Sequence, residues 1–485
     1  MTSIRNSLAV SFLDKYSSLV LQTLSTLILA RLLTPEEIGI YSLGAVIIGF
    51  AQMLRDFGVS NYLVQEKDLT RERIRTAFGV TLLIAWSAAT LLLIFSDSLA
   101  TLYDKPEVST VIWILTISLF FIPINSTVLG LLRRNLDFKT IFHINISSAI
   151  SHAVTGVFLA YNDFGFASLA WASVASAATT LLVGLLKRPD DSEFIPSLKE
   201  FKRIFSFGAY ASSSSLLSEA GLSAPDLTIS HNLGFSFLGY YSRAVGLVSI
   251  FNYTVSAAIN PVILPAFSNS LRENRPIKQP YLMAVSYMSV VSWTFFGFLT
   301  LLALPVTRVL YGDQWDDAVL AAQILCFAFM IQSVISFAGP GLMSLGMIKY
   351  TFFIQLIVQT PRVILTVIAS FYSIEHVALV QVLFYFYCLV IYHLILHKRL
   401  DISVADLFRN TSKSFVIAFI ANLIPFAIVY TSFFDNHFIM VLSAGIGCLM
   451  GFVLGIYITH HPLSLEINAL KDKLFFFVKG IKNES

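Results

Sequence analysis

Fourteen long apolar stretches are the feature that most constrains how this chain can fold. A helix that crosses the hydrocarbon core of a bilayer needs about 20 predominantly apolar residues. Only 13% of the 485 residues are charged and 56% are hydrophobic, whereas soluble chains carry about 25% charged residues. We therefore predict an all-α integral membrane protein with about 14 transmembrane helices, at 7–30, 38–54, 76–96, 109–132, 141–160, 165–186, 204–230, 238–265, 281–304, 319–344, 350–372, 376–397, 414–433 and 438–459.

The basic residues predict which side of the membrane each connection faces. An even number of spans puts both termini on one side, and 26 of the 32 lysines and arginines fall on that side. The opposite side holds three, Arg31, Lys105 and Arg308, among acidic residues such as Glu36 and Asp313. Cytoplasmic loops carry the excess of Lys and Arg, so both termini are predicted to be cytoplasmic.

The two ends of the chain and its cysteines have simple interpretations. The apolar stretch after Arg5 is too long for the core of a cleavable signal peptide, so we expect it to be the first span. From Leu463 onward, apolar residues recur at helical spacing with lysines between them, which predicts an amphipathic helix on the cytoplasmic membrane surface. A partly disordered tail is the alternative. Cys326, Cys388 and Cys448 are expected to face lipid or to pack as small residues.

The sequence partly repeats itself. Residues 33–42 open the second span and share Leu, Gly, Tyr and Ser with residues 233–242, which open the eighth. Two further matches follow in the same order, Leu102-Tyr103-Asp104 with Leu310-Tyr311-Gly-Asp313 and Gly130-Leu131 with Gly341-Leu342. Each match pairs one span with the sixth span after it, so the two copies have the same orientation, as in a parallel transporter repeat.

This repeat predicts two six-helix lobes followed by two extra helices. The expected parts are an N-terminal lobe at 1–203, a C-terminal lobe at 204–397, extra spans at 398–459 and the tail at 460–485. A parallel two-lobe repeat is typical of transporters, because a site between the lobes can open to either side in turn.

Polar residues recur at helical spacing in five predicted spans. A charge in hydrocarbon costs at least about 2.5–3.5 kcal/mol, so these stripes predict a water-accessible central cavity. The alternative is that they only hydrogen-bond neighbouring helices. The stripes comprise Asp14, Lys15, Ser18, Gln22 and Ser25; Asn145, Ser148, His152 and Thr155; Ser212, Ser215, Glu219, Ser223 and Asp226; Arg243, Ser249, Asn252, Ser256 and Asn260; and Gln355, Gln359, Arg362 and Thr366.

Two of these stripes carry more specific expectations. Spans five and eleven are repeat mates, so His152 and Arg362 are expected at the same depth in their lobes. In span seven, Glu219 and Asp226 flank Gly221 and Pro225, which are candidates to interrupt the helix. Broken helices beside carboxylates are typical of coupling-ion sites, and structural pairing is the alternative.

Nothing in the sequence predicts an enzyme. The nucleotide-binding patterns GxGxxG and GxxxxGK[ST] and the zinc pattern HExxH are absent from the sequence. No outer loop is large enough for a glycosyl-transfer site. We expect no catalytic residue, no metal site and no cofactor.

Short motifs in both halves resemble those of bacterial polysaccharide-repeat-unit flippases. The resemblance covers residues 5–460 and is strongest to the Wzx-type branch of the multidrug/oligosaccharidyl-lipid/polysaccharide exporter superfamily, in its colanic-acid-exporter-like subgroup. The motifs are Arg31-Leu-Leu-Thr-Pro-Glu-Glu-Ile-Gly-Ile-Tyr41, Asp56-Phe-Gly58 with Val64-Gln65, Arg133-Arg-Asn-Leu-Asp-Phe-Lys139, Leu238-Gly-Tyr-Tyr-Ser-Arg-Ala244, Pro265-Ala-Phe-Ser268 and Tyr311-Gly-Asp-Gln-Trp-Asp-Asp-Ala318.

The resemblance implies a V-shaped fold of two lobes with alternating access. It implies that an undecaprenyl-diphosphate-linked oligosaccharide is flipped from the cytoplasmic to the periplasmic leaflet of the bacterial inner membrane. The family's cavity is cationic, and arginine matches phosphate oxygens well. The matching candidates for the diphosphate are Lys15, Arg31, Arg55, Arg243 and Arg362, and those for the sugars are Gln22, His152, Asn252, Gln355 and Gln359.

The resemblance also implies an energy source, a substrate class and partners. H⁺, Na⁺ or the membrane potential would bias the cycle, with Asp14, Glu219 and Asp226 as the candidate carboxylates. Span one has fewer arginines than the lipid II-flipping branch, which favours O-antigen or exopolysaccharide export. The expected partners are a lipid-linked oligosaccharide, membrane lipids, and a polysaccharide polymerase with its chain-length machinery, but no nucleic acid.

Two other functions stay as alternatives. A cation-coupled multidrug exporter of the same superfamily would favour an acidic cavity, whereas the charges placed in these stripes are mixed to basic. A membrane-embedded glycosyltransferase or ligase would need a sizeable outer loop, and the connections here are short.

Overall fold

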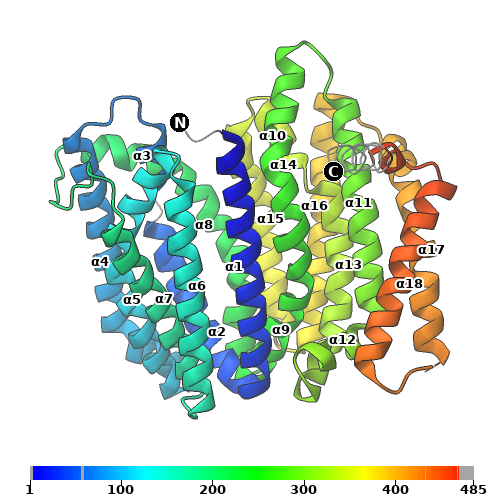
Figure 1. The fold of residues 1–485 in the computed structure, drawn as a ribbon, viewed down its shortest axis with the longest axis horizontal. Helices are drawn as coiled ribbons and strands as arrows, with labels where there is room; N and C mark the ends of the chain where they lie inside the picture. The colour runs from blue at the N-terminus through cyan, green and yellow to red at the C-terminus, as the bar shows by residue number, and fades with distance from the viewer. Residues whose placement is uncertain (1–3, 56–58, 432, 467, 469–485) are drawn as a thin grey trace, which may run out of the picture. The chain divides into compact units, whose positions relative to one another are not determined.

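The chain is helical throughout the part that the structure, a computed structural model, describes. That part comprises residues 4–55, 59–431, 433–466 and 468 (Figure 1). The elements are α1 (Ile4–Leu32), α2 (Pro35–Arg55), α3 (Val59–Gln65), α4 (Arg71–Leu102), α5 (Pro106–Arg134), α6 (Phe138–Tyr161), α7 (Phe166–Leu186), α8 (Phe201–Asn232), α9 (Phe235–Phe251), the π-helix η1 (Asn252–Ser256), α10 (Ala257–Arg272), α11 (Lys278–Leu301), α12 (Ala303–Leu310), the 3₁₀-helix η2 (Asp313–Ala318), α13 (Val319–Ile335), α14 (Ala338–Ser344), α15 (Ile348–Ala369), α16 (Ile374–Leu400), α17 (Val404–Thr431) and α18 (His437–Ile458).

Most predicted spans coincide with these helices to within about six residues, but α17 begins at Val404, ten residues before the predicted start at 414, and α10 ends at Arg272, seven residues after the predicted end at 265. Within the described residues, nine helical segments are long and apolar enough to cross a membrane, and Phe353–Ala369 is a shorter apolar helix. Helices α1, α2, α8, α9 and α10 also fall outside that set in the described part of the chain. The chain is an all-helical, multi-pass membrane protein, and the total of fourteen spans stays a prediction.

The helices divide into two compact units. Unit 1 comprises Met1–Ser242 and Ile354–Ile374, and unit 2 comprises Arg243–Phe353 and Glu375–Ser485. Unit 1 therefore contains α8, the first turns of α9 and most of α15 in addition to α1–α7. These boundaries differ from those of the predicted lobes, which stay a prediction.

In unit 1, the segment that joins the two sequence repeats is fastened to the start of α4. The backbone N–H of Ser197 donates to the carbonyl of Arg75 at 3.2 Å. A Cβ placed on Gly79 would lie 2.3 Å from the carbonyl oxygen of Ser197, so only glycine allows this approach. Arg75 also pairs with Glu193 at 3.2 Å. The connection at 187–200 is thus docked on its own unit.

In unit 2, helices α17 and α18 pack closely through a line of glycines. A Cβ on Gly451 would lie 2.8 Å from Cα of Ala421, and one on Gly455 would lie 3.3 Å from Cα of Ile417. Glycines four residues apart let helix backbones approach closely, which is the main source of helix association within lipid. The last two helices therefore form a fixed pair.

A buried histidine fastens this pair to α11. His461 is fully buried, and its Nε2 lies 2.9 Å from Oγ of Ser286. Its Nδ1 accepts from the backbone N–H of Leu463 at 3.2 Å, so Nε2 carries the proton and donates to Ser286. Ser414 of α17 donates to the carbonyl of Ser286 at 3.1 Å. The neutral form of His461 fits this network because Nδ1 must accept.

We expect this histidine to make stability depend on pH. Burial, with the charge of nearby Lys413, lowers the pKa of His461 to about 4 from its ordinary 6.5. The stabilisation is therefore present above about pH 6.5 and is lost as the pH falls toward 4, with a loss of about 2 kcal/mol at pH 5. Thermal unfolding in detergent at pH 7 and pH 5 checks this, and His461→Gln should reduce the difference between the two. An equal pH effect in both proteins would contradict the assignment.

Two predictions about local structure need correction, and one falls outside the described residues. Helix α8 is continuous across Gly221 and Pro225, so the predicted interruption of span seven is wrong. Proline removes a single N–H donor and leaves only the carbonyl of Gly221 without its usual helical partner, and α8 continues past it. Span ten was predicted as one helix but is divided at 336–337 into α13 and α14. Most of the predicted amphipathic tail, 467 and 469–485, is not described.

Candidate substrate and ion sites

Helices α1 and α6 bring a carboxylate and an amide together in unit 1. Asn145 donates through Nδ2 to Oδ2 of Asp14 at 2.9 Å. The other carboxylate oxygen, Oδ1, is buried and makes no hydrogen bond of ordinary geometry with a described residue. Ser18 follows Asp14 one helical turn later on the same face. The carboxylate thus keeps an open acceptor, as a proton or a small cation requires.

A chain of hydroxyls continues along the same α6 stripe. Ser148 Oγ lies 2.7 Å from Oγ of Ser176 on α7, and Thr180 donates to Ser148 at 3.2 Å. The Ser148 hydroxyl therefore joins two helices through side chains. The sequence analysis noted Ser148 but missed Ser176 and Thr180. Their spacing of four residues in an otherwise apolar helix was the available signal.

In unit 1, the carboxylates of α8 lie on one face of that helix. Glu219, Ser223, Asp226 and Ser230 are spaced at i, i+4, i+7 and i+11, which is one side of an α-helix. The Ser223 hydroxyl donates to Oε1 of Glu219 at 3.1 Å, and both Ser223 and Ser230 are buried. This face is thus an acidic stripe whose serines are buried and whose carboxylate residues are partly buried.

The opposite face of α8 meets the polar stripe of α15. Gly221 lies about 200° around the helix from Glu219, and a Cβ on Gly221 would be 1.9 Å from Oε1 of Gln359. Arg362 donates through Nη1 to the same Oε1 at 3.4 Å, and Gln359 donates through Nε2 to Gln355 at 3.1 Å. Gln355, Gln359 and Arg362 therefore form one ordered row, and Gly221 makes room for it.

Arg362 differs from the other basic residues in its burial. It is 6% exposed, and among the described side chains it is the only lysine or arginine that is buried. A buried guanidinium is costly unless its charge is compensated, so a residue of this kind in a membrane helix marks a functional candidate. Arg362, on α15, lies against the face of α8 that is opposite Glu219. The candidate phosphate ligand is therefore separated from the candidate coupling carboxylates of α8.

Arg243, in unit 2, is stacked between aromatic rings. Its guanidinium carbon lies 5.5 Å from the ring centre of Tyr311 and 5.4 Å from that of Trp315. Both rings are buried. Such stacking stabilises an arginine by about 0.5–2 kcal/mol and fixes its direction. Tyr311 and Trp315 are site residues that the sequence analysis did not find, because they lie about 70 residues away along the chain, at the end of α12 and in η2.

Asn252 is the first residue of the π-helix between α9 and α10. It accepts a hydrogen bond from Ser256 at 3.1 Å through Oδ1. Single π turns inside α-helices occur frequently at functional sites. Asn252, a predicted sugar-binding residue, thus begins a local change of helix type in span eight that the sequence analysis did not predict.

The remaining predicted residues are less constrained by the structure. Lys15, Gln22 and Arg31 lie on α1 with exposed side chains, and His152 on α6 is partly buried. Arg55 ends α2, and its side chain lies outside the described part of the structure. Their predicted contacts with substrate stay predictions.

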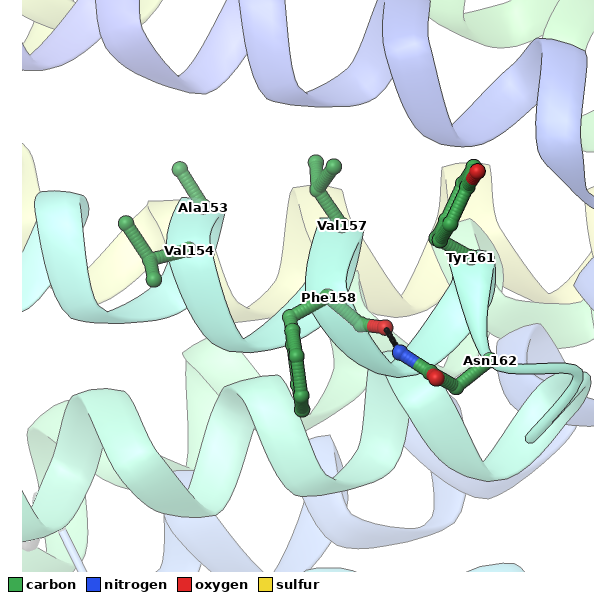
Figure 2. Close-up of a pocket in the computed structure, with 6 residues that line it drawn as sticks. All are labelled: Ala153, Val154, Val157, Phe158, Tyr161 and Asn162. Atoms are coloured by element: carbon green, nitrogen blue, oxygen red, sulfur yellow. Dashed lines mark hydrogen bonds between the residues drawn. The ribbon is translucent and has the colours of Figure 1, made fainter.

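A cavity of 740 Å³ lies beside α6, and none of the six residues that line it is a predicted site residue. Figure 2 shows Ala153, Val157 and Tyr161 pointing to one side of the helix and Phe158 to the other. Asn162 caps the turn by donating to the carbonyl of Phe158 at 2.7 Å. This lining is apolar, so it suits hydrocarbon better than a charged headgroup.

On the predicted periplasmic side, ion pairs hold the helix ends of each unit. In unit 1, Lys105 donates to Glu36 at 2.6 Å, and this hydrogen bond raises the pKa of Lys105. In unit 2, Arg308 pairs with Asp316 at 2.6 Å, and the Nη1 of Arg308 lies 3.3 Å from Nε2 of His437. Two of the three basic residues predicted on that side are thus used in structural pairs.

The sequence matches known proteins of polysaccharide biosynthesis. A family model described as "Polysaccharide biosynthesis protein" matches residues 28–320. The succinoglycan biosynthesis transport protein ExoT of Rhizobium meliloti is 28% identical over 65% of this chain and 64% of its own. The lipopolysaccharide biosynthesis protein WzxC of Escherichia coli is 21% identical over 67% of this chain and 66% of its own. The chain thus spans just under two thirds of these two relatives. For the teichuronic acid biosynthesis protein TuaB of Bacillus subtilis, the identity is 21% over 87% of both.

Solved structures share the fold. The lipid II flippase MurJ in an inward closed conformation matches with a TM-score of 0.77 and 15% identity, covering 95% of this chain and all of MurJ. An inward-facing multidrug resistance transporter of the MATE family, in the MOP superfamily, matches with a TM-score of 0.61 and 18% identity, covering 80% of this chain and 98% of that one. The chain has the MurJ- and MATE-like fold.

Proposed function

Because the chain belongs to the family of polysaccharide biosynthesis proteins, we propose that it flips an undecaprenyl-diphosphate-linked oligosaccharide, an O-antigen or exopolysaccharide repeat unit, from the cytoplasmic to the periplasmic leaflet. The family match over residues 28–320 is the observation that supports a polysaccharide precursor as the substrate class. It also confirms the family predicted from the motifs. The named relatives include a succinoglycan transport protein, and the matched structures are membrane transporters, which supports a transporter and not an enzyme.

The headgroup contacts are proposed from the geometry of α15. The row Gln355, Gln359 and Arg362 supplies two amides and a buried guanidinium in successive turns. A diphosphate presents oxygens that accept from all three, and a guanidinium is the preferred partner because it donates in a fork. The amides are suited to neighbouring sugar hydroxyls. Further contacts along the path of the headgroup are proposed for the other predicted site residues: Asn252, Arg243, His152, Gln22, Lys15, Arg31 and Arg55.

The architecture that goes with this function is the predicted one. We propose fourteen spans in two six-helix lobes with two extra C-terminal helices, located in the bacterial inner membrane with both termini in the cytoplasm. The lobes alternate in access, the diphosphate enters from the cytoplasmic side, and the lipid tail stays in the bilayer. Short loops and the basic excess on the cytoplasmic side support this topology.

We propose that Asp14 couples the cycle to an ion gradient, because its Oδ1 is buried with an open acceptor site. Glu219 and Asp226 are secondary candidates on α8. Asp14→Asn keeps the size of the side chain and removes the charge, so flipping should lose its dependence on a proton or sodium gradient. The measurement is the flipping rate in liposomes with each gradient imposed or collapsed, with Ser109→Ala as a control outside the stripes. A gradient dependence unchanged in Asp14→Asn would exclude this residue.

The proposed function is tested by reconstitution with defined substrates. Liposomes containing the protein and an undecaprenyl-diphosphate-linked oligosaccharide should show rapid exposure of the sugar on the opposite side. Efflux of organic cations without any movement of the lipid-linked sugar would instead favour the multidrug exporter alternative. Transfer of sugar to a new acceptor would favour the glycosyltransferase alternative.

A further inference from the structure

Two histidines lie one helical turn apart at the predicted cytoplasmic end of α16, in unit 2. His393 and His397 are four residues apart, so both side chains project from one face of the helix. Their ring centres are 6.1 Å apart, and the ring planes are inclined by only 23°. Neither residue belongs to the predicted substrate or ion sites. The two imidazoles are thus placed together without a role in the proposed flipping.

This spacing is one that helices use to bind a metal ion through two histidines. In the zinc pattern HExxH, the two histidines stand at positions i and i+4 and bind the metal from one face. Residues 393–397 read His-Leu-Ile-Leu-His, so both ligand positions are filled, and Leu394 stands where the pattern has its catalytic glutamate. The segment can therefore hold a metal ion, but it lacks the general base for hydrolysis.

The hydrogen bond of His397 fixes which of its ring nitrogens is available. Its Nδ1 lies 3.3 Å from the carbonyl oxygen of Ile402. A carbonyl can only accept, so Nδ1 carries the proton and Nε2 keeps the lone pair that a metal needs. Metal-binding histidines almost always hold their other nitrogen in this way. His397 is exposed, so its ring is open to an approaching ion.

The turn after α16 holds that carbonyl in place. Ile402 is fully buried. The carbonyl of Asp401 accepts from Nζ of Lys278 at 2.6 Å, and the backbone N–H of Ser403 donates to Oδ2 of Asp406 at 2.9 Å. Lys278 also pairs with Asp406 at 2.9 Å. A rigid partner orients the imidazole before a metal binds, which lowers the ordering cost of binding.

His393 has no hydrogen bond to give up at its Nδ1. This atom is buried and makes no hydrogen bond with a described residue. The ring can therefore turn toward a metal at His397 without losing a bond there. A polar atom that stays buried without a partner costs about 1–3 kcal/mol, so a metal that draws the ring outward also relieves this cost.

The other side chains near the pair decide which metals fit. Lys398 and Arg399 lie about 100° and 200° around the helix from His397, so neither projects from the face that carries the histidine pair. Among the described residues, no three of His, Cys, Asp and Glu gather closely enough to bind one ion, so water must supply the remaining ligands. Imidazole suits Cu²⁺, Ni²⁺ and Zn²⁺, whereas Ca²⁺ and Mg²⁺ prefer oxygen ligands.

We propose that His393 and His397 form a two-histidine site for a late first-row divalent metal ion, Cu²⁺, Ni²⁺ or Zn²⁺, with water as the remaining ligands. The ion ties the last turn of α16 to the turn at 400–403 through the bond from His397 to Ile402, and so stabilises this end of unit 2. The site is independent of the proposed flipping. It departs from the expectation of no metal site, which rested on the absence of the complete HExxH pattern.

Electron paramagnetic resonance with Cu²⁺ tests the site in the full chain, purified in detergent without a histidine tag. One equivalent of Cu²⁺ should give the signal of two nitrogen ligands. His397→Gln should weaken binding at least about 10-fold, since even loss of an outer-shell partner costs about 10–100-fold. His393→Gln should do the same while leaving the bond from His397 to Ile402 in place. His376→Gln, at the other end of α16, is the matched control and should bind as the native protein does.

A shifted histidine tests the spacing. His397→Gln with Lys398→His keeps the number of histidines but moves the second one from about 40° to about 140° around the helix from His393, so binding should stay weak. Zn²⁺ should raise the unfolding temperature of the native protein but not that of the three variants without the pair. If His397→Gln does not fold, His393→Gln decides. A native protein without a two-nitrogen signal, or variants that bind Cu²⁺ as tightly as the native protein, would overturn the site.

Discussion

Replacing Arg362 by glutamine is expected to lower the rate of oligosaccharide flipping by about 10- to 150-fold. The guanidinium is 6% exposed and lies in a row with Gln359 and Gln355. Loss of a charge-assisted contact to phosphate removes about 1.5–3 kcal/mol, and every 1.36 kcal/mol that stabilises the transition state changes a rate tenfold. Glutamine at position 362 keeps a polar side chain that can donate hydrogen bonds, as its neighbours Gln359 and Gln355 do, but it lacks the positive charge. The variant therefore tests the contribution of that charge.

Arg362→Lys separates charge from geometry. Lysine keeps the positive charge but lacks the planar fork of donors, so an intermediate rate is expected. Flipping rates in liposomes, with thermal unfolding to confirm that each variant is folded, provide the comparison. If Arg362→Gln flips at the native rate, Arg362 is a structural residue and the proposed headgroup row is wrong.

One added methyl group at Gly239 is expected to have the second largest effect. A Cβ there would lie 2.0 Å from the carbonyl oxygen of Pro35, well inside van der Waals contact. The neighbour is backbone and cannot rotate away, so α2 and α9 must separate. Overpacking of this kind costs about 1–3 kcal/mol, and Gly239→Ala should therefore lower the thermal unfolding temperature and slow flipping.

Gly246→Ala is the matched control for this prediction. Gly246 lies on the same helix, and a Cβ there would meet the hydroxyl of Tyr311 at an ordinary 3.5 Å. We expect this variant to unfold and flip almost as the native protein does. Equal behaviour of Gly239→Ala and Gly246→Ala would mean that the close contact of α2 with α9 does not form.

Hydropathy was sufficient to predict where most helices lie, because spanning segments must bury apolar side chains in lipid. The polar stripes on spans one and five were predicted to line a cavity, with hydrogen bonding between helices as the alternative, and in the structure Asp14 of the first stripe accepts a hydrogen bond from Asn145 of the second. The repeat offset of 200 residues led to segments that meet in the fold at Ser42 and Ser242. The helix positions and the repeat could be predicted because they depend on local periodicity and on internal similarity, whereas the contacts of Asp14 with Asn145 and of Ser42 with Ser242 were not predicted.

The partners of Arg243 and Arg362 could not be predicted from the sequence. Arg243 stacks on Tyr311 and Trp315, and the Arg362 row is accommodated by Gly221 on another helix. Such contacts depend on how helices distant in sequence pack, which periodicity within one helix does not encode. Pro225 was taken as a candidate to interrupt α8, whereas the helix continues through it.

The most direct test of the central claim is the flipping assay with the native chain and with a variant that carries both Arg243→Ala and Arg362→Ala. The protein is reconstituted with an undecaprenyl-diphosphate-linked oligosaccharide, and access of the sugar to the opposite side is followed over time. We predict rapid flipping by the native protein and loss of flipping in the folded double variant. Flipping that persists in the double variant would contradict the cationic site, and no flipping by the native protein with any diphosphate-linked oligosaccharide would contradict the proposed function.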